Sequence, residues 1–96
     1  MSYRFLPPAA REVGEAARYY EEKVPGLGFD FIAEVRADIR RILAHPEAWC
    51  PLDEQCRRCR TSRFPYGLIY TIEDDHILII SVMHLHRHPD TWRKNL

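Results

Sequence analysis

Two consecutive segments near the N-terminus carry apolar residues at the three- and four-residue intervals of an amphipathic helix. The first follows Pro7-Pro8, which fit a first helical turn, and contains Val13, Ala16, Ala17, Tyr20 and Val24. The second runs for about four to five turns before Pro46, and contains Leu27, Phe31, Ile32, Val35, Ile39, Ile42 and Leu43. Since only Pro25-Gly26 separates them, the pattern predicts an antiparallel helical hairpin with one apolar stripe.

Strand-like segments flank this hairpin. Residues 2–6 are predicted to form a short strand that Pro7 stops, residues 56–63 alternate weakly, and residues 66–73 and 76–85 are typical strands joined by an acidic turn. The expected fold is therefore α+β: an N-terminal strand, an antiparallel helical hairpin, and a three-stranded antiparallel meander, all in one small sheet with the helices on one face.

The last predicted strand is apolar at both parities, from Ile77 to Met83, which is typical of a strand covered on both faces. One helical hairpin covers only one face of a small sheet, so the second face is expected to bind a partner outside the chain. The candidate contacts, with the parity left open, are Leu68, Tyr70, Ile72, Leu78, Ile80 and Val82, or their opposite-parity neighbours.

Length and composition fit one domain spanning residues 1–96: 46% of residues are hydrophobic and 29% are charged. Fourteen basic residues balance 14 acidic ones, which excludes nucleic-acid binding through bulk charge and leaves only local binding. No stretch approaches the roughly 18 apolar residues of a membrane span, and no signal-peptide core is present, so we expect a cytoplasmic protein without a membrane partner. The three cysteines are then expected to be reduced thiols.

Four arginines, Arg57, Arg58, Arg60 and Arg63, lie within seven residues. They are consistent with a local phosphate-binding patch, but also with a charged strand edge that prevents unwanted pairing with other sheets.

The histidines, the cysteines and Trp92 are candidate functional residues, but each also has a purely structural interpretation. His84, His86 and His88 alternate along a strand end, but without a matching carboxylate or cysteine we expect no metal site, and His84 is expected to make a structural hydrogen bond. Cys56 and Cys59 have redox-motif spacing but lie on a predicted strand, so we interpret them as small buried hydrophobes, and we expect no cofactor. Trp92 is either a packing anchor for the tail or a stacking surface for a base.

Two segments carry a resemblance to a known family: Arg-Phe-Pro-Tyr-Gly-Leu-Ile-Tyr at residues 63–70, and Val-Met-His-Leu-His-Arg-His-Pro-Asp-Thr-Trp at residues 82–92. They resemble the C-terminal half of RelE/ParE-superfamily toxins. The hairpin with its Pro-Gly turn, His45-Pro46, and the order of elements extend the resemblance over nearly the whole chain. It implies the toxin of a type II toxin–antitoxin system, inhibited by a cognate antitoxin that is a small DNA-binding protein, in a hetero-oligomer. The arginine cluster then has a third interpretation, as the partner of acidic antitoxin residues.

The superfamily implies two alternative activities. ParE-like members poison DNA gyrase by protein–protein binding and need no catalytic residue, whereas RelE-like members cleave messenger RNA on the ribosome. In the second case, the resemblance implies catalytic roles for Arg60, Arg63, Arg87 and His84. Binding roles are expected in either case for Arg58, Tyr66, Leu68, Tyr70, Ile80, Val82 and Trp92.

Two positions favour the ParE-like activity. Gly67 stands where RelE-like enzymes carry an arginine, and Trp92 stands where they carry a tyrosine near the C-terminus. Indole has no proton to exchange as a general acid or base, so that substitution removes chemistry and keeps only stacking. Outside the family, the alternative is a non-toxic interaction domain that dimerises through the same apolar face.

Overall fold

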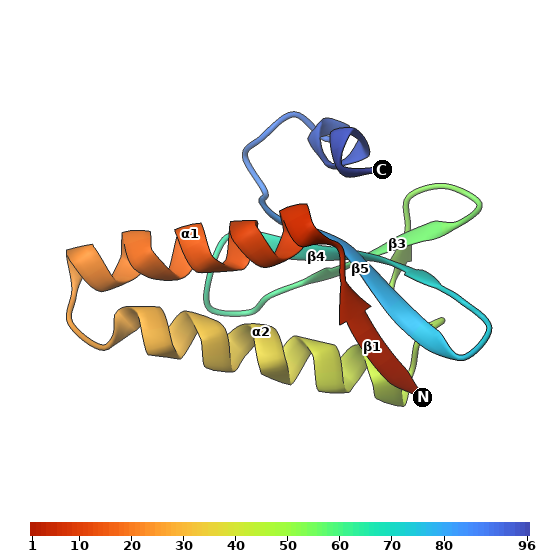
Figure 1. Ribbon diagram of the computed structural model, residues 1–96, viewed down its shortest axis with the longest axis horizontal. Coiled ribbons are helices and arrows are strands. Elements are labelled where there is room, and N and C mark those ends of the chain that lie inside the picture. Colours follow the sequence, from red (N-terminus) through yellow and green to blue (C-terminus); the bar gives the residue numbers. More distant parts are fainter.

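A computed structural model describes all residues from 1 to 96 and confirms the α+β architecture (Figure 1). Its elements are β1 (Ser2–Phe5), α1 (Pro7–Lys23), α2 (Leu27–Ala44), β2 (Cys50–Pro51), β3 (Cys56–Arg60), β4 (Tyr66–Ile72), β5 (His76–His84) and a C-terminal 3₁₀ helix, η1 (Thr91–Asn95). The helical hairpin and the β3–β4–β5 meander are as the sequence predicts. The two-residue strand β2, which pairs with β3 at one edge, was not predicted.

The five strands form one sheet in the order β1-β5-β4-β3-β2. The β1 strand runs parallel to β5, with Tyr3 opposite Ile77, and every other pairing is antiparallel. Because β1 has only four residues, it leaves the second half of β5 without a strand neighbour on that side.

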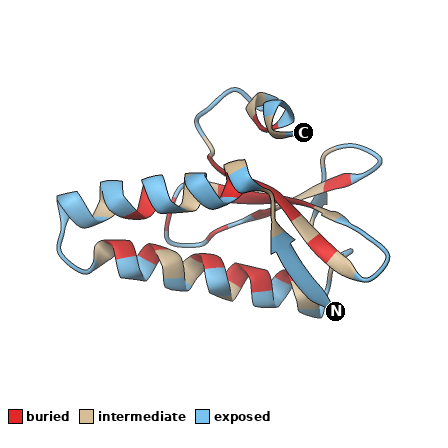
Figure 2. Cartoon of the chain, in the orientation of Figure 1, coloured by how far each residue is buried: buried red, intermediate tan, exposed pale blue.

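Both helices pack on the same face of the sheet, and the main core lies between them and the strands (Figures 1 and 2). Phe31, Val35, Ile39 and Ile42 form the buried stripe of α2, as its periodicity predicts. The sheet contributes Leu68, Tyr70, Ile77, Ile79 and Val82 to this core.

The tip of the hairpin is fixed by glycine and by a side-chain cap. Gly26 adopts a φ of 89°, a left-handed conformation that favours glycine. The Glu21 carboxylate accepts hydrogen bonds from the Gly26 and Gly28 N–H groups, at 2.9 and 3.0 Å. A side chain of α1 therefore satisfies free donors at the start of α2 and fixes how the two helices meet.

The second face of the sheet is covered by the chain itself, so the expectation that it awaits an outside partner is wrong. Cys56, Ile69, Ile80, Met83 and Trp92 form a second, smaller core there, and only 2% of Trp92 is exposed. Its cover is the η1 turn, which the tail following β5 carries back over the sheet (Figure 1).

β5 is apolar at both parities because each face of the sheet carries a core, and a β-bulge changes which parity faces which core. Ile69 pairs with Ser81 and Tyr70 pairs with Ile79, so Ile80 is the extra residue between them. As a result, Ile79 and Val82 lie in the main core while Ile80 and Met83 lie in the second core.

Candidate functional site: a cleft between the first helix and the C-terminal turn

A cleft of about 660 Å³ opens where α1, the ends of β4 and β5, and the C-terminal turn meet. This volume is within the range of small-molecule sites. Its walls contain Pro8, Arg11, Glu12, Glu15, Ala16, Tyr19, Tyr66, Val82, Met83, His84, His86, Arg87, Lys94 and Asn95.

Glu12 holds the elements of the cleft together. Its carboxylate accepts hydrogen bonds from the Ser81 hydroxyl at 2.9 Å, the Val82 N–H at 3.0 Å and the Asn95 side-chain amide at 3.3 Å. The same Asn95 amide donates to the Ile80 carbonyl at 3.0 Å. Together, Glu12 and Asn95 provide hydrogen-bond partners for backbone groups of β5 that β1 leaves unpaired, and they connect η1 to α1.

Three cations line the cleft from three different elements: Arg11 from α1, Arg87 from the loop after β5, and Lys94 from η1. None of them takes part in an ion pair, since the ion pairs of the chain involve other basic residues. Their charges are therefore available to a ligand.

Aromatic rings form part of the wall. The Tyr66 ring meets the His84 ring edge to face at 5.2 Å, and His84 meets His86 in the same way at 4.8 Å. His84 Nδ1 accepts a hydrogen bond from the His86 N–H at 3.1 Å, which confirms the structural role expected for His84. Burial and the neighbouring Tyr20 raise the pKa of Tyr66, against the effect of Arg87, so Tyr66 is a neutral hydrogen-bond donor at pH 7.

Of the residues with an implied nuclease role, only His84 and Arg87 lie in this cleft. Arg60 is exposed on β3, opposite Gly67. Arg63 lies in the β3–β4 loop and pairs with Asp30 of α2 at 3.7 Å. The four residues therefore do not form one site.

The arginine cluster also divides between different structural roles. Arg57 donates to the carbonyls of Glu47 and Trp49, at 3.1 and 2.8 Å, and so holds the loop after α2. The side chain of Arg58 lies across Gly67, where a Cβ atom would come within 3.1 Å of its Cγ and Cδ atoms. Gly67 thus makes room for Arg58, and no single patch of four cations exists.

The predicted binding residues fall into three groups. Tyr66 lines the cleft, and Arg58 lies partly buried over the second face. Leu68, Tyr70 and Val82 are buried in the main core, and Ile80 and Trp92 are buried in the second core. The packing interpretation of Trp92 is the one the structure bears out, and none of these five offers a free surface.

Cys56 and Cys59 lie in different cores, Cys56 in the second and Cys59 in the main one. An odd separation of three residues places them on opposite faces of β3, so they do not face one another. Burial raises the pKa of both thiols, that of Cys59 to about 12. Their interpretation as small buried hydrophobes is confirmed.

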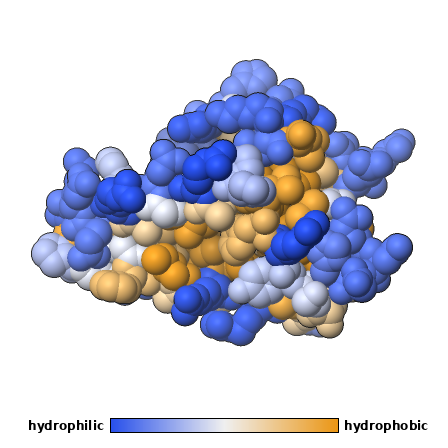
Figure 3. Space-filling view, viewed as in Figure 1, coloured by the Kyte–Doolittle hydropathy of each residue, from blue (hydrophilic) through white to orange (hydrophobic).

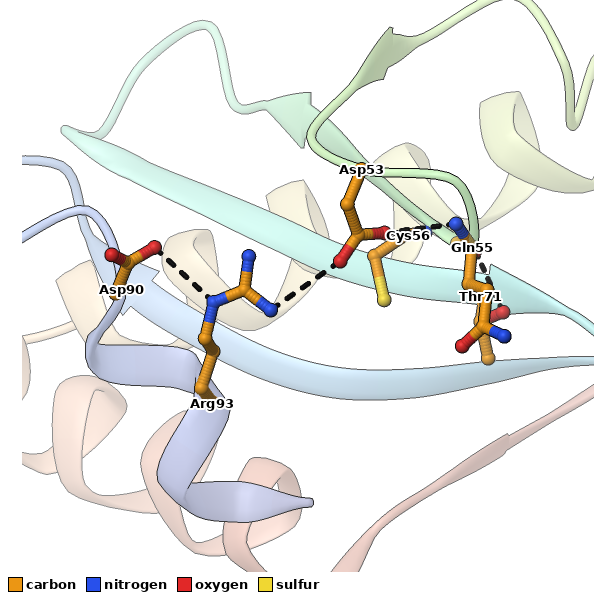
Figure 4. A network of polar contacts seen from close by, with 6 residues as sticks. All are labelled: Asp53, Gln55, Cys56, Thr71, Asp90 and Arg93. Carbon is orange, nitrogen blue, oxygen red and sulfur yellow. Dashed lines mark hydrogen bonds and ion pairs between the residues drawn. The ribbon is translucent and has the colours of Figure 1, made fainter.

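A polar network attaches η1 to the β2–β3 loop (Figure 4). The Arg93 guanidinium lies 3.4 Å from Asp53 and 3.3 Å from Asp90. Asp53 also accepts hydrogen bonds from the Gln55 and Cys56 N–H groups, at 2.8 and 2.7 Å, and these lower its pKa. The C-terminal wall of the cleft is thus held by Trp92 inside and by Arg93 outside.

Sequence reasoning missed Arg11, Glu12, Lys94 and Asn95 as residues of a common site. Glu12 and Asn95 are 83 residues apart, and both lie in segments whose polar residues are typical of solvent-exposed positions. No local spacing links them, because their proximity depends on how the tail returns over β5.

The architecture resembles that of a known protein structure. A chain from a solved structure described as the chromosomal ParDE TA system from P. aeruginosa superposes with a TM-score of 0.78 at 14% sequence identity, covering 90% of this chain and 97% of that one. At this identity the likeness shows the fold. The comparison with curated proteins found no match.

A family model described as the ParE toxin of the type II toxin–antitoxin system parDE matches residues 3–89. Together with the fold, this match defines the class of the protein: a toxin of a type II toxin–antitoxin system with the RelE/ParE architecture. Within that class, the chain belongs to the ParE toxin family. No helix in the structure is both long and apolar enough to span a bilayer.

Proposed function

We propose that this ParE-family toxin arrests growth by binding DNA gyrase, and that a cognate antitoxin neutralises it by direct binding. The observation that carries the proposal is the family match over residues 3–89. In this account the toxic event is protein–protein binding, and no side chain performs a chemical step.

The dispersal of the implied nuclease residues supports this choice. Ribonucleolytic catalysis needs acid–base and charge-stabilising groups around one phosphate. Here Arg60 and Arg63 lie outside the cleft that contains His84 and Arg87, and Trp92 is buried. The residues implied for messenger RNA cleavage therefore do not converge on a reacting group.

We place the antitoxin at the end of the sheet where β1 is the edge strand. β1 pairs only with β5, and the Leu6 N–H donates to the Ile79 carbonyl at 2.9 Å. Along a strand, the N–H and C=O groups of successive residues point alternately to the two neighbouring strand positions. The N–H and C=O groups of Tyr3 and Phe5 therefore point away from β5, to the open edge. An extended antitoxin segment can add to this edge as a further strand.

The side chains beside this edge suit such a segment. Met1, Tyr3 and Ile72 are exposed, and Tyr3 and Ile72 both neighbour Ile77 in the sheet register. A hollow of about 470 Å³ lies between Met1, Ile72 and the C-terminal end of α2. Figure 3 shows hydrophobic surface between the helices and toward the sheet, whereas the hairpin tip and the C-terminal turn are mostly hydrophilic in this view.

Expression in growing cells tests the proposal. The chain expressed alone is expected to arrest growth and to cause gyrase-dependent DNA breaks, and co-expression of the cognate antitoxin is expected to prevent both. Codon-phased cuts in transcripts without DNA damage would favour the RelE-like activity instead. Normal growth at confirmed soluble expression would favour a non-toxic interaction domain.

A further inference from the structure

We propose that the cleft between α1 and the C-terminal turn binds the phosphate backbone of a nucleic-acid strand, one nucleotide unit of which fits within it. The proposed binding of a strand does not depend on whether the toxin acts on gyrase. The further statement that the strand is DNA held by gyrase rests on the proposed function.

The first argument is charge. Arg11, Arg87 and Lys94 reach the cleft from three elements without an ion-pair partner. Glu12, one of the two carboxylates in the wall, has its oxygens committed to hydrogen bonds from Ser81, Val82 and Asn95. The wall thus carries three cations against the two carboxylates of Glu12 and Glu15, a local excess of one positive charge. Since the whole chain has no net charge, this local excess is what an anionic ligand would recognise.

The second argument is the chemistry of the wall. Tyr66 provides a neutral hydroxyl donor, and the row of rings from Tyr66 through His84 to His86 provides aromatic surface. Hydroxyl donors and cations bind phosphate oxygens, and aromatic rings stack on unpaired bases. A small free anion uses only the first of these features, whereas a nucleotide unit uses both.

The third argument is the size and the rigidity of the site. A volume of about 660 Å³ exceeds what one phosphate ion needs and falls in the range of drug-sized ligands. The wall is preorganised, because Glu12 and Asn95 join α1, β5 and η1 by hydrogen bonds, and buried Trp92 anchors η1. A preorganised site loses less conformational entropy when it binds a ligand.

The experiment measures fluorescence anisotropy of labelled 12-nucleotide single strands of DNA and RNA with the purified chain, from low to physiological salt. The test variant combines Arg11→Gln, Arg87→Gln and Lys94→Gln. The control combines Arg18→Gln, Arg36→Gln and Arg40→Gln, which removes the same charge from exposed residues of the two helices that make no ion pair. Thermal melts establish that both variants fold.

We expect the cleft variant to weaken binding about tenfold or more, and to reduce the slope of log affinity against log salt by roughly 2 for three lost phosphate contacts. The control is expected to change affinity less than about twofold. A second variant, His86→Ala, is expected to weaken binding to strands but not to inorganic phosphate used as a competitor. Similar affinity for the DNA and RNA strands identifies the backbone as the ligand.

Three results would overturn the proposal: no strand binding by the wild-type chain at low salt, an equal loss in the cleft and control variants, or complete competition by millimolar inorganic phosphate with no effect of His86→Ala. A parallel gyrase supercoiling assay separates the two proposals. Gyrase inhibition without strand binding supports the proposed function and rejects this site. Strand binding without gyrase inhibition supports this site and rejects the proposed function.

Discussion

At the scale of single residues, Asp38 is the most unusual group in the core. Its side chain is fully buried on α2, where it pairs with Arg41, and its second carboxylate oxygen has no hydrogen-bond partner. Burial raises its pKa to about 6, although Arg41 acts in the opposite direction. A carboxyl group with a raised pKa binds its proton more tightly in the folded chain than in the unfolded one.

This raised pKa predicts a pH dependence of stability. Protonated Asp38 favours the folded state, so its contribution is complete below the unfolded pKa of 3.8 and is lost as pH rises through about 6. Between pH 4 and 7 the free energy of unfolding is expected to lose about 1–3 kcal/mol from this group. Urea unfolding of the wild type and of Asp38→Asn across this range isolates the effect, because other titrating groups are common to both. Identical pH profiles would contradict it.

Trp92 is the residue on which the second core depends. Truncation to alanine removes the largest side chain of that cluster, and is expected to lower the free energy of unfolding by about 3–5 kcal/mol. Leu96→Ala, in an exposed residue just after the same turn, is the matched control and is expected to cost less than about 0.5 kcal/mol. Equal effects in denaturant unfolding would show that the turn does not pack as described.

At the scale of elements, periodicity predicted both helices, and the strand-forming residues together with the acidic turn predicted the three long strands. The bounds differ by one to three residues; α1, for example, begins at Pro7 and β3 ends at Arg60. The sequence could not reveal the cover of the second face, because η1 has only five residues and shows no apolar period. The bulge at Ile80 is likewise a property of the pairing between β4 and β5, and not of either strand alone.

The candidate site was predictable only in part, because some of its residues come together only in the tertiary structure. Tyr66, His84 and Arg87 lie in segments 63–70 and 82–92 that resemble the toxin superfamily, and they line the cleft. The resemblance groups Arg60 and Arg63 with them, but Arg60 is exposed on β3, and Arg63 lies in the β3–β4 loop and pairs with Asp30. Arg11 and Lys94 meet these residues only through the tertiary fold.

The contact between the two helices gives a test with a built-in control. A Cβ atom at Gly28 would lie 2.5 Å from the Ala17 carbonyl oxygen, which is backbone and does not give way, so Gly28→Ala is expected to destabilise the fold by about 1–3 kcal/mol. Gly14, an exposed residue of α1, has no atom within 4 Å of such a Cβ, so Gly14→Ala is expected to stabilise the fold by about 0.5–1 kcal/mol. Thermal unfolding gives both values. The same sign for both substitutions would contradict the close approach at Gly28.

At the scale of the whole molecule, three separate exposed surfaces lie outside the two cores. The β1 edge with exposed Tyr3 lies at the end of the sheet where the hollow beside Ile72 opens. The tip of the helical hairpin projects away from the sheet (Figure 1). The side chain of Phe29, near this tip, is 75% exposed. The cleft lies on a third side, between α1 and η1.

Antitoxin binding distinguishes the first two of these surfaces. Tyr3→Ser removes an exposed aromatic beside the β1 edge, and is expected to weaken the complex with the cognate antitoxin about tenfold or more. Phe29→Ser, which removes a more exposed aromatic at the hairpin tip, is expected to change the affinity less than about threefold. Isothermal titration of the two variants against the antitoxin checks this, and the reverse ranking would move the antitoxin site to the hairpin.

The central claim, that this ParE-family toxin acts on gyrase and not on messenger RNA, is tested most directly with purified components. The chain is added to DNA gyrase, ATP and relaxed plasmid, and supercoiling and double-strand cleavage are followed on gels. The account predicts loss of supercoiling with accumulation of cleaved DNA, and reversal by the antitoxin. Unchanged supercoiling and cleavage, in the presence of a folded chain that cuts messenger RNA in a ribosome-programmed reaction, would contradict it.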